Sequence, residues 1–576
     1  MSEECKPEYW FLDVDGEIKL TIRTGHSTKG PNLTRRVDIP QNVLLSGRAA
    51  EWQNLLEEKA AKATLAKPYT SGNEVTALID GKDFMSDLYE ELLPEKDKPK
   101  DDLQGLDEED PDFILITGWE FWKRRALCER VPKSSQQESM SALPDVLNTA
   151  LSKGATMRVL SFDNPIPVGV GPRTTSFVEA MNVLLKHSAV LVAPHNPFVS
   201  HHQKEVFIAR SAFKESCAYV GGMDLAINRW DDSKHEKREP EDLNFGWHDI
   251  QLKVRGDAAL QLWANFAERW KDARKKTVGA NLLDCPVPRW SAKEWKKRPK
   301  EIGKQHVQVL RTVGEAGTRE RRRDRFMADG EKTVLCGFEK AISKAECYIY
   351  IEEQFLWDCE LADYIAARMK VKKDLRLIIV MTAGCEIPPD LGGDYAFFLR
   401  HAFLRTVMRV QERDAGDYGD EYRVYPYGLY QLERDGHNEI YVHSKLFIID
   451  DRYVAVGSAN VDRRSMHIET EITLGVVDGK LVDGKLGGKP AKVCAFAKDL
   501  REKLWKEHLG VPSLGSDDPI EVLKQFPGTG GTWPIDPQEA RNDQKHHLRC
   551  YIAYKGRLLQ ENICRLLDRS EREWRQ

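Results

Sequence analysis

The sequence has no long hydrophobic run and no recognisable export leader. None of its apolar stretches reaches the roughly 18 residues that a membrane-spanning helix needs. The first residues, MSEECKPEYWFLDVDGEIKL, lack the positive stretch followed by an apolar core that marks a Sec-type signal peptide. We therefore expect a cytoplasmic or peripheral membrane protein, and export by a route without such a signal stays open.

Paired cysteines and an excess of positive charge are also missing. The 11 cysteines are odd in number, scattered and free of close Cys-x-x-Cys pairs, which argues against a disulfide scaffold and a structural zinc site. Lys and Arg total 86 against 91 Asp and Glu, for a net charge of -5. The chain therefore lacks the basic excess typical of nucleic-acid binding, and we expect no nucleic-acid partner.

Signatures of metal and nucleotide sites are absent as well. No cluster of carboxylates has metal-ligand spacing, and the glycine-rich stretches lack a Walker-type Lys-Ser ending. We expect no metal and no cofactor.

One order of elements occurs twice along the chain. A helical pattern followed by an apolar strand pattern lies at 83–119 and again at 334–357. Each pair is followed by a helix, a second apolar strand (156–162 and 375–382), another helix and a segment with His-x-Lys. Repeated β-α-β-α units predict an α/β fold with two similar halves and one cleft shared between them.

The second His-x-Lys segment, HSKLFIID, is followed by the turn VGSAN. His443 and Lys445 are two apart and face the same side of a strand, and Asp450 follows four apolar residues. The turn offers backbone N–H groups, the Ser458 hydroxyl and the Asn460 amide to an anion. Because a lysine, an amide and turn N–H groups stabilise the charge of a phosphorane-like transition state, the segment predicts a phosphate site.

Each of these features, taken alone, has a plain structural explanation. His-x-Lys on a strand is usually a pair of solvent-exposed side chains without a chemical role, and Gly-Ser-x-Asn is usually only a turn. Here they occur together, with a partial copy in the other half, HHQKEVFIARSAFKESCAYVGGMDLAINRWDD. The combination predicts a functional site.

These segments resemble the two HKD motifs of the phospholipase D superfamily: HHQK with GGMDL, and HSKLFIID with GSANVDRRS. Further stretches resemble its eukaryotic-type branch in the expected order: ITGW, GWHDIQLKVRG with NFAERW, VQVLRT, IYIEEQF and IYVHSKL. The resemblance runs from about residue 75 to about residue 510. It implies an α/β fold of two similar halves, each a mixed β-sheet flanked by helices in an α-β-α sandwich, with pseudo-two-fold symmetry and the active site between them.

The resemblance also implies a covalent mechanism. The family uses a histidine of the first motif as the nucleophile on phosphorus, which matches His202, and a histidine of the second as the general acid, which matches His443. A carboxylate holds the far nitrogen of each ring in the family. From their places in GWHDI and TEI, we expect Asp249 to serve His202 and Glu471 to serve His443.

The remaining motif positions are expected to bind substrate or to support the turns. Lys204, Lys445 and Asn460 would hold the phosphoryl oxygens, with Ser458 in support. Structural motif positions are Asp224, Asp450, Gly221, Gly222 and Gly457.

The first motif departs from the family pattern at one position. An aspartate should follow EVFI, but the residue there is Ala209. Because that aspartate is expected to support local structure rather than to touch phosphate, we expect activity to survive. A weakened first half, or a catalytically dead binding protein, is the alternative.

The predicted organisation has five parts. They are an N-terminal extension of unknown role at 1–70, a first half at 71–275, a linker at 276–304, a second half at 305–515 and a C-terminal extension at 516–576.

The expected reaction is that of a phospholipase D. It hydrolyses the distal phosphodiester bond of a glycerophospholipid to phosphatidic acid and a free headgroup alcohol, with transphosphatidylation when an alcohol replaces water. A cardiolipin-synthase-like phosphatidyltransferase is an alternative, although those proteins often carry strongly apolar segments; an HKD nuclease is another.

The expected partners are a phospholipid substrate and a membrane surface. The charged stretch RERRRDRF at 319–326 is a candidate for peripheral contact with that surface, although a short run of mixed charge is usually a solvated helix face. Since one chain carries both motifs, a monomer is sufficient for a complete site.

Overall fold

The computed structural model describes most of both halves. The described residues are 6–12, 63–93, 112–121, 143–162, 189–192, 200–210, 215–235, 246–276, 287–288, 301–314, 330–382, 393–418, 423–433, 436–526 and 548–550. The stretch 319–326, most of the predicted linker and most of the predicted C-terminal extension lie outside them. The predicted division into five parts therefore remains a prediction.

The first half is built on a mixed sheet with the strand order β4, β3, β2, β5, β6, β8, β1. The three strands β2, β3 and β4 are parallel, and the other pairings are antiparallel. The elements up to the end of this half are α1 Pro7–Trp10, β1 Thr70–Ile79, α4 Asp80–Leu92, β2 Phe113–Gly118, α6 Leu143–Ser152, β3 Thr156–Phe162, β4 Ala189–Val192, β5 Glu205–Ala209, β6 Cys217–Gly221, the 3-10 helix η4 Ile227–Arg229, β7 Gly246–His248, β8 Ile250–Arg255 and α8 Asp257–Lys276.

The second half repeats this arrangement with the strand order β13, β12, β11, β15, β16, β17, β9. Its elements are β9 Gln305–Val313, β10 Glu331–Lys332, α11 Thr333–Lys344, β11 Tyr348–Glu353, α12 Cys359–Val371, β12 Arg376–Met381, α13 Gly393–Tyr418, β13 Val424–Glu433, β14 Gly436–Val442, β15 Leu446–Ile449, β16 Tyr453–Gly457, α14 Arg463–His467, β17 Glu471–Asp478, β18 Leu481–Leu486, β19 Lys489–Cys494, α15 Ala495–Leu509, α16 Pro519–Leu523 and β20 Leu548–Cys550.

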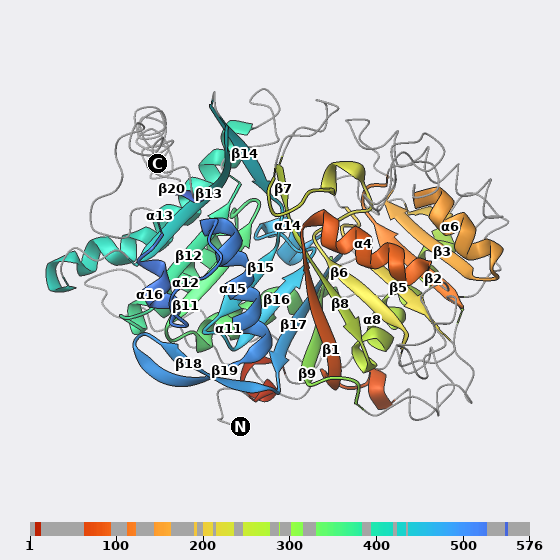
Figure 1. The fold of residues 1–576 in the computed structure, drawn as a ribbon, viewed down its shortest axis with the longest axis horizontal. Helices are drawn as coiled ribbons and strands as arrows, with labels where there is room; N and C mark the ends of the chain where they lie inside the picture. The colour runs from red at the N-terminus through yellow and green to blue at the C-terminus, as the bar shows by residue number, and fades with distance from the viewer. Residues whose placement is uncertain are drawn as a thin grey trace.

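The two sheets lie side by side and are joined by β1 (Figure 1). This strand pairs with β8 along most of its length and, at its start, with β9 of the other sheet. In both halves the order of parallel and antiparallel neighbours is the same, and each His-x-Lys segment leads into the corresponding strand, β5 or β15. The predicted duplicated α/β fold is confirmed.

Each sheet is buried on both faces, as its apolar strands require. In β2, Phe113 and Leu115 belong to the core that includes α8, whereas Ile114 and Ile116 pack with α4 and α6. Successive residues of a strand point to opposite faces, so α8 covers one face and α4 with α6 the other.

The second sheet has the same layers. Tyr348 and Tyr350 of β11 contact Trp505 of α15 on one face. Phe447 of β15 stacks on Phe338 of α11 on the other face, with ring centroids 4.4 Å apart. Both halves are therefore α-β-α sandwiches, as predicted.

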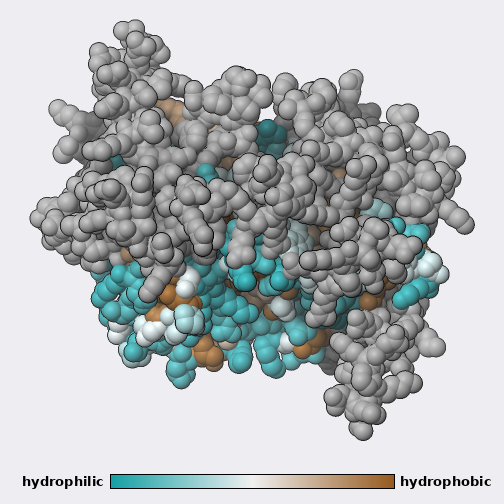
Figure 2. Space-filling view, turned by 45° about the horizontal axis from the view of Figure 1, so that its top comes forward, coloured by the Kyte–Doolittle hydropathy of each residue, from teal (hydrophilic) through white to brown (hydrophobic). Residues whose placement is uncertain are grey.

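The described surface is mostly polar. On the face shown in Figure 2, hydrophilic residues dominate the coloured atoms and hydrophobic ones form small, separate patches. Large hydrophobic side chains that are exposed among the described residues are Val371 and Ile468. No described helix combines the length and the apolar character needed to span a bilayer.

Candidate active site

Backbone pairing between the halves brings the two motifs together. The segment before β5 pairs with the residue before β17: the His202 N–H donates to the Thr470 carbonyl over 2.9 Å, and the Thr470 N–H donates to the Ser200 carbonyl over 3.1 Å. Likewise β14, which leads into the second motif, runs parallel to β7 of the first half, and the His443 N–H donates to the His248 carbonyl. Each histidine therefore lies beside a strand end of the opposite half.

This crossing reverses the expected partners of the two histidines. His202 Nδ1 lies 3.0 and 3.1 Å from the carboxylate oxygens of Glu471, and His443 Nδ1 lies 2.7 Å from Asp249 Oδ2. The expected pairs, Asp249 with His202 and Glu471 with His443, were wrong. They assumed that each half supplies its own carboxylate, whereas the strand pairing places the carboxylate of the other half beside each ring.

Each carboxylate is held by its own surroundings. Glu471 accepts hydrogen bonds from Ser458 Oγ over 2.5 Å and from Ser465 Oγ over 2.8 Å. The Ser458 hydroxyl therefore donates to Glu471 rather than to the phosphate position expected from its turn. Asp249 Oδ1 accepts the Ile250 N–H over 2.8 Å, and a Cβ at Gly222 would lie 2.2 Å from the same oxygen. Gly222 thus allows the close approach of Asp249.

The two lysines are positioned by the backbone of their own histidines. Lys204 Nζ donates to the His202 carbonyl over 3.0 Å and lies 3.6 Å from Asp224 Oδ2. Lys445 Nζ donates to the His443 carbonyl and to Gln354 Oε1, the latter over 3.1 Å. Both ammonium groups are buried, so their charge acts in a poorly screened environment.

Burial and neighbouring charges keep both imidazoles neutral. Burial, followed by the charge of Lys204, lowers the pKa of His202 to about 3. Burial and then Lys445 hold the pKa of His443 well below its usual range. Lys445 also acts on His202, and Lys204 on His443, so all four groups share one electrostatic site.

The same burial acts on the other ionisable groups. It raises the pKa of Glu471 to about 7, against the opposing effect of Lys204. Burial also raises the pKa of Asp249, against the effect of Lys445. The pKa of Lys445 falls to about 8, first through burial and further through Lys204.

The predicted structural positions support turns and strand ends around the site. Asp224 Oδ1 accepts the N–H groups of Trp119 and Glu120 over 2.8 and 3.2 Å. A Cβ at Gly221 or at Gly457 would lie 2.3 Å from a carbonyl oxygen of the neighbouring strand. These glycines therefore permit close packing beside the site.

Asp450 and Ala209 occupy corresponding positions with different chemistry. The Asp450 carboxylate accepts three backbone N–H groups, those of Glu346, Cys347 and Tyr348, over 2.7 to 2.8 Å. In the first half, the carbonyl of Ala209 accepts the Asp112 N–H over 2.8 Å. A main-chain oxygen thus accepts one of the N–H groups that the missing aspartate would have accepted.

Several aromatic and polar neighbours lie inside motifs read from the sequence but received no role there. Trp247, in GWHDI, packs against His443 with ring centroids 4.7 Å apart, and Arg229 lies 3.9 Å over its ring. Trp119, in ITGW, contacts His202 edge-on, and Gln354, in IYIEEQF, contacts Lys445. Their positions inside those motifs were the signal in the sequence that could have indicated a place near the site.

Comparisons with known proteins point to one family. A family model described as Phospholipase D matches residues 236–366 and 420–525. The second motif lies inside this match, whereas His202 and Lys204 lie before it.

The chain is also similar to curated relatives. It is 24% identical to Phospholipase D1 of Saccharomyces cerevisiae over 555 residues, which cover 80% of this chain and 30% of that relative. It is 23% identical to Phospholipase D gamma 2 of Arabidopsis thaliana, covering 71% of this chain and 61% of the relative. The chain therefore spans less than two thirds of the length of these relatives.

Among solved structures, a phosphatidylserine synthase of Haemophilus influenzae is similar over 76% of this chain and 87% of that one. Its sequence identity is 14% and its TM-score is 0.43, which is too low to support an inference. The ordered motifs, the family match and the named relatives show that this chain belongs to the phospholipase D superfamily, in its eukaryotic-type branch.

Proposed function

We propose that this protein is a phospholipase D that cleaves the distal phosphodiester bond of a glycerophospholipid. The observation that carries the proposal is the pair of histidines, one from each half, each with Nδ1 held by a buried carboxylate. Within the described residues neither Nε2 is engaged in a hydrogen bond, so both rings keep a reactive nitrogen for substrate. The names of the relatives support the same chemistry.

In the proposed first step, His202 Nε2 attacks phosphorus and the bond to the headgroup oxygen breaks. A neutral imidazole is the nucleophilic form, and the low pKa of His202 provides it near pH 7. Glu471 accepts a hydrogen bond from the Nδ1–H group and stabilises the positive charge that develops on the ring.

His443 acts as general acid and then as general base. Its Nε2 proton goes to the leaving headgroup oxygen. In the second step the same nitrogen takes a proton from water or an alcohol, whose oxygen attacks phosphorus while the bond between phosphorus and His202 Nε2 breaks and the phosphatidyl product leaves. The low pKa of His443 opposes protonation of its ring. An anionic phosphodiester placed between the two rings raises the pKa of His443. Asp249 favours the protonated ring further.

The lysines and Asn460 are proposed to hold the non-bridging oxygens of phosphorus. Two buried ammonium groups can balance the charge of a phosphorane-like transition state in a site where water screens little. The Asn460 side chain is buried, and its Oδ1 has no hydrogen-bond partner among the described residues, so its amide can turn to meet a ligand.

The proposed partner is a phospholipid surface that the protein contacts peripherally. One chain supplies all six proposed catalytic residues, so we propose that a monomer is sufficient. These residues are His202, Lys204, Asp249, His443, Lys445 and Glu471.

The test is product analysis with mixed phospholipid vesicles and 1-butanol. We expect phosphatidic acid and phosphatidylbutanol, because water and alcohol compete for one phosphohistidine. The substitutions His202→Ala and His443→Ala should each lower the rate by about 10²–10⁴-fold or more. With a phosphodiester that carries a good leaving group, His443→Ala should still release that group once and leave a phosphoryl adduct on His202, whereas His202→Ala should give neither.

A matched control is His306→Ala, because His306 is a partly buried histidine of β9 that bonds Ser71 away from both motifs. Its rate should equal that of the unchanged protein. A fully active His202→Ala variant would refute the nucleophile, and cleavage of DNA with no lipid product would replace the proposed substrate class.

A further inference from the structure

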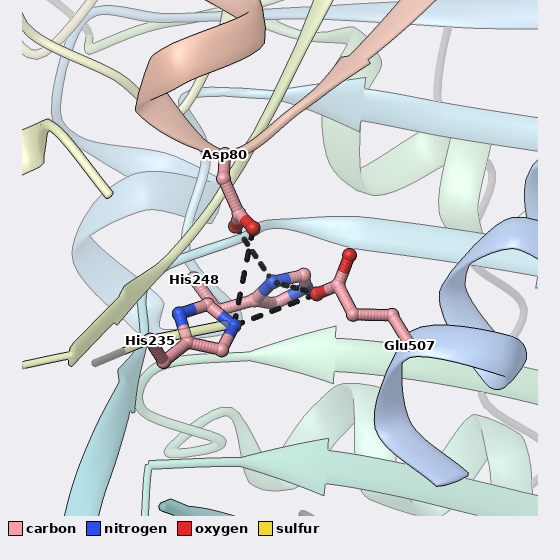
Figure 3. Close-up of side chains that lie close together, drawn as sticks. All are labelled: Asp80, His235, His248 and Glu507. Carbon is pink, nitrogen blue, oxygen red and sulfur yellow. Dashed lines mark hydrogen bonds and ion pairs between the residues drawn. The ribbon is translucent and has the colours of Figure 1, made fainter. Parts of the chain in front are cut away.

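A second cluster of ionisable side chains lies behind the active site, between the two halves. Asp80 begins α4, His235 lies in the loop after η4, His248 ends β7 and Glu507 lies on α15. Figure 3 shows the four side chains pointing toward one another. One donor atom from each lies within 4.8 Å of all the others.

The distances between these donor atoms fit the edges of a small coordination sphere. His248 Nδ1 lies 3.3 Å from Glu507 Oε1 and 2.9 Å from Asp80 Oδ1. His235 Nε2 lies 3.5 Å from the same Glu507 oxygen and 3.9 Å from Asp80 Oδ2. Four ligands at about 2.0–2.2 Å from a tetrahedral zinc ion lie about 3.3–3.6 Å from one another. The distances of 3.3 and 3.5 Å to Glu507 lie in this range, and those of 2.9 and 3.9 Å to Asp80 lie within about 0.4 Å of it.

Both histidines are oriented as metal-binding histidines usually are. His248 directs its other nitrogen, Nε2, at Glu352 Oε2 over 3.0 Å. His235 directs its other nitrogen, Nδ1, at Asp231 Oδ2 over 2.8 Å. A carboxylate on the far nitrogen fixes the tautomer in which the near nitrogen carries a lone pair, which is what a metal requires.

The two carboxylates also present atoms to this space. Asp80 Oδ2 and Glu507 Oε1 are buried and accept no hydrogen bond of normal geometry from the described residues. The Asp80 side chain is only 1% exposed.

Glu352, which is also close to His248, is not a candidate ligand. Its carboxylate already receives hydrogen bonds from Ser444, Tyr350 and His508 as well as from His248. A carboxylate with that many donors serves to orient its neighbours.

We infer that Asp80, His235, His248 and Glu507 form a binding site for one divalent transition metal ion, with zinc as the best match. Two imidazole nitrogens and two carboxylate oxygens in this arrangement suit zinc, whereas calcium prefers oxygen ligands alone. The sequence predicted no metal, because these four residues never occur at metal-ligand spacing along the chain.

The site has a positioning role toward the catalytic pair. The Asp80 N–H donates to the Asp249 carbonyl over 2.8 Å, and His248 directly precedes Asp249. Asp249 in turn holds His443. A metal at this place would join α4, β7 and α15 and fix the backbone that carries the partner of His443.

The experiment measures the metal itself. The full chain, produced without a polyhistidine tag and purified without chelators, is analysed by elemental mass spectrometry and by thermal unfolding before and after dipicolinate treatment. We expect one zinc per chain, a lower unfolding temperature after its removal, and recovery when zinc is added back. Cobalt loaded in its place should give the intense visible bands of a four-coordinate ion.

Two substitutions locate the metal, with matched controls. His235→Ala and Glu507→Gln should each lose the metal and the cobalt bands. His306→Ala, on β9, and Glu502→Gln, on the same helix α15 and paired with Lys498, should keep both.

Three results would overturn the inference. They are an unmodified protein that neither contains zinc nor gains stability from added zinc, manganese or cobalt; metal that stays bound in both His235→Ala and Glu507→Gln; or binding of calcium alone. The measurements on the unmodified protein decide the question even if one variant fails to fold.

Discussion

At the scale of single residues, the site depends on small differences between the two motifs. Ser458 donates to Glu471, whereas the matching position of the first half is Gly222, against which Asp249 lies directly. The longer side chain, Glu471, is thus held by the Ser458 hydroxyl, and the shorter side chain, Asp249, approaches the backbone of Gly222. Different side chains give each histidine an equivalent carboxylate partner.

The pH dependence of kcat/KM follows from Glu471 and Lys445. In the proposed mechanism Glu471 acts as a carboxylate, and because its pKa is raised to about 7 it is mostly ionised only above that pH. The rate should therefore rise as the pH rises through about 7. Lys445, with its pKa lowered to about 8, loses its charge above that pH, so the rate should fall there. Phospholipid turnover measured from pH 5 to 10 should therefore peak between about 7 and 8.

The substitution Lys445→Arg tests the basic limb. Arginine stays charged throughout this range, so the fall above pH 8 should move upward even though the maximal rate is lower. Lys492→Arg, at an exposed lysine paired with Asp483, should leave the profile unchanged. An unmoved basic limb in Lys445→Arg would show that another group controls it.

At the scale of elements, the two halves share strand order but differ in how their strand ends are held. The turn after β15 places the Asp450 carboxylate on three N–H groups at the start of β11. At the matching position, the last residue of β5, the Ala209 carbonyl accepts one N–H group. The departure from the family pattern thus falls on a strand end, and His202 and Lys204 still make their contacts with Glu471 and with the backbone.

Replacing Asp450 by Ala should destabilise the second half without removing a catalytic group. It leaves N–H groups at the start of β11 without their acceptor, and one such buried donor costs about 1–3 kcal/mol. Urea unfolding should show at least this loss. The activity per folded molecule should change little, because Asp450 contacts backbone rather than the histidines.

Asp483→Ala is the matched control, because the Asp483 side chain is 90% exposed. Its free energy of unfolding should change by less than about 0.5 kcal/mol. Equal stability of both variants would contradict the strand-end role of Asp450.

At the scale of the whole molecule, segments distant in sequence complete the second half. The N-terminal residues 7–12 received no role from the sequence, yet Trp10 is 1% exposed and stacks on Tyr453 of β16 with centroids 5.6 Å apart. The Leu12 N–H also donates to Gln308 of β9 over 3.0 Å. These residues of the predicted N-terminal extension are part of the core of the second half.

The substitution Trp10→Ala should therefore lower the free energy of unfolding by about 3–5 kcal/mol, the cost of truncating a buried tryptophan. Denaturant unfolding followed by tyrosine and tryptophan fluorescence measures this change. Val371→Ala, at a side chain that is 65% exposed, is the control and should have almost no effect. A Trp10→Ala variant as stable as the control would show that the N-terminal segment adds nothing to the fold.

The sequence by itself determined the duplicated α/β fold and the motifs that carry the candidate site residues. Apolar strand periodicity, the repeated order of elements and the spacing of His443, Lys445 and Asn460 are local properties, so they can be read along the chain. The motif at His202 and Lys204 was recognised in the same way.

Only the tertiary structure decided which carboxylate serves which histidine, and which residues meet behind them. The pairing of β7 with β14, and of residue 201 with residue 470, joins opposite halves. Asp80 and Glu507 likewise come from distant helices. Contacts of this kind depend on how two sheets pack, and local periodicity carries no information about that packing.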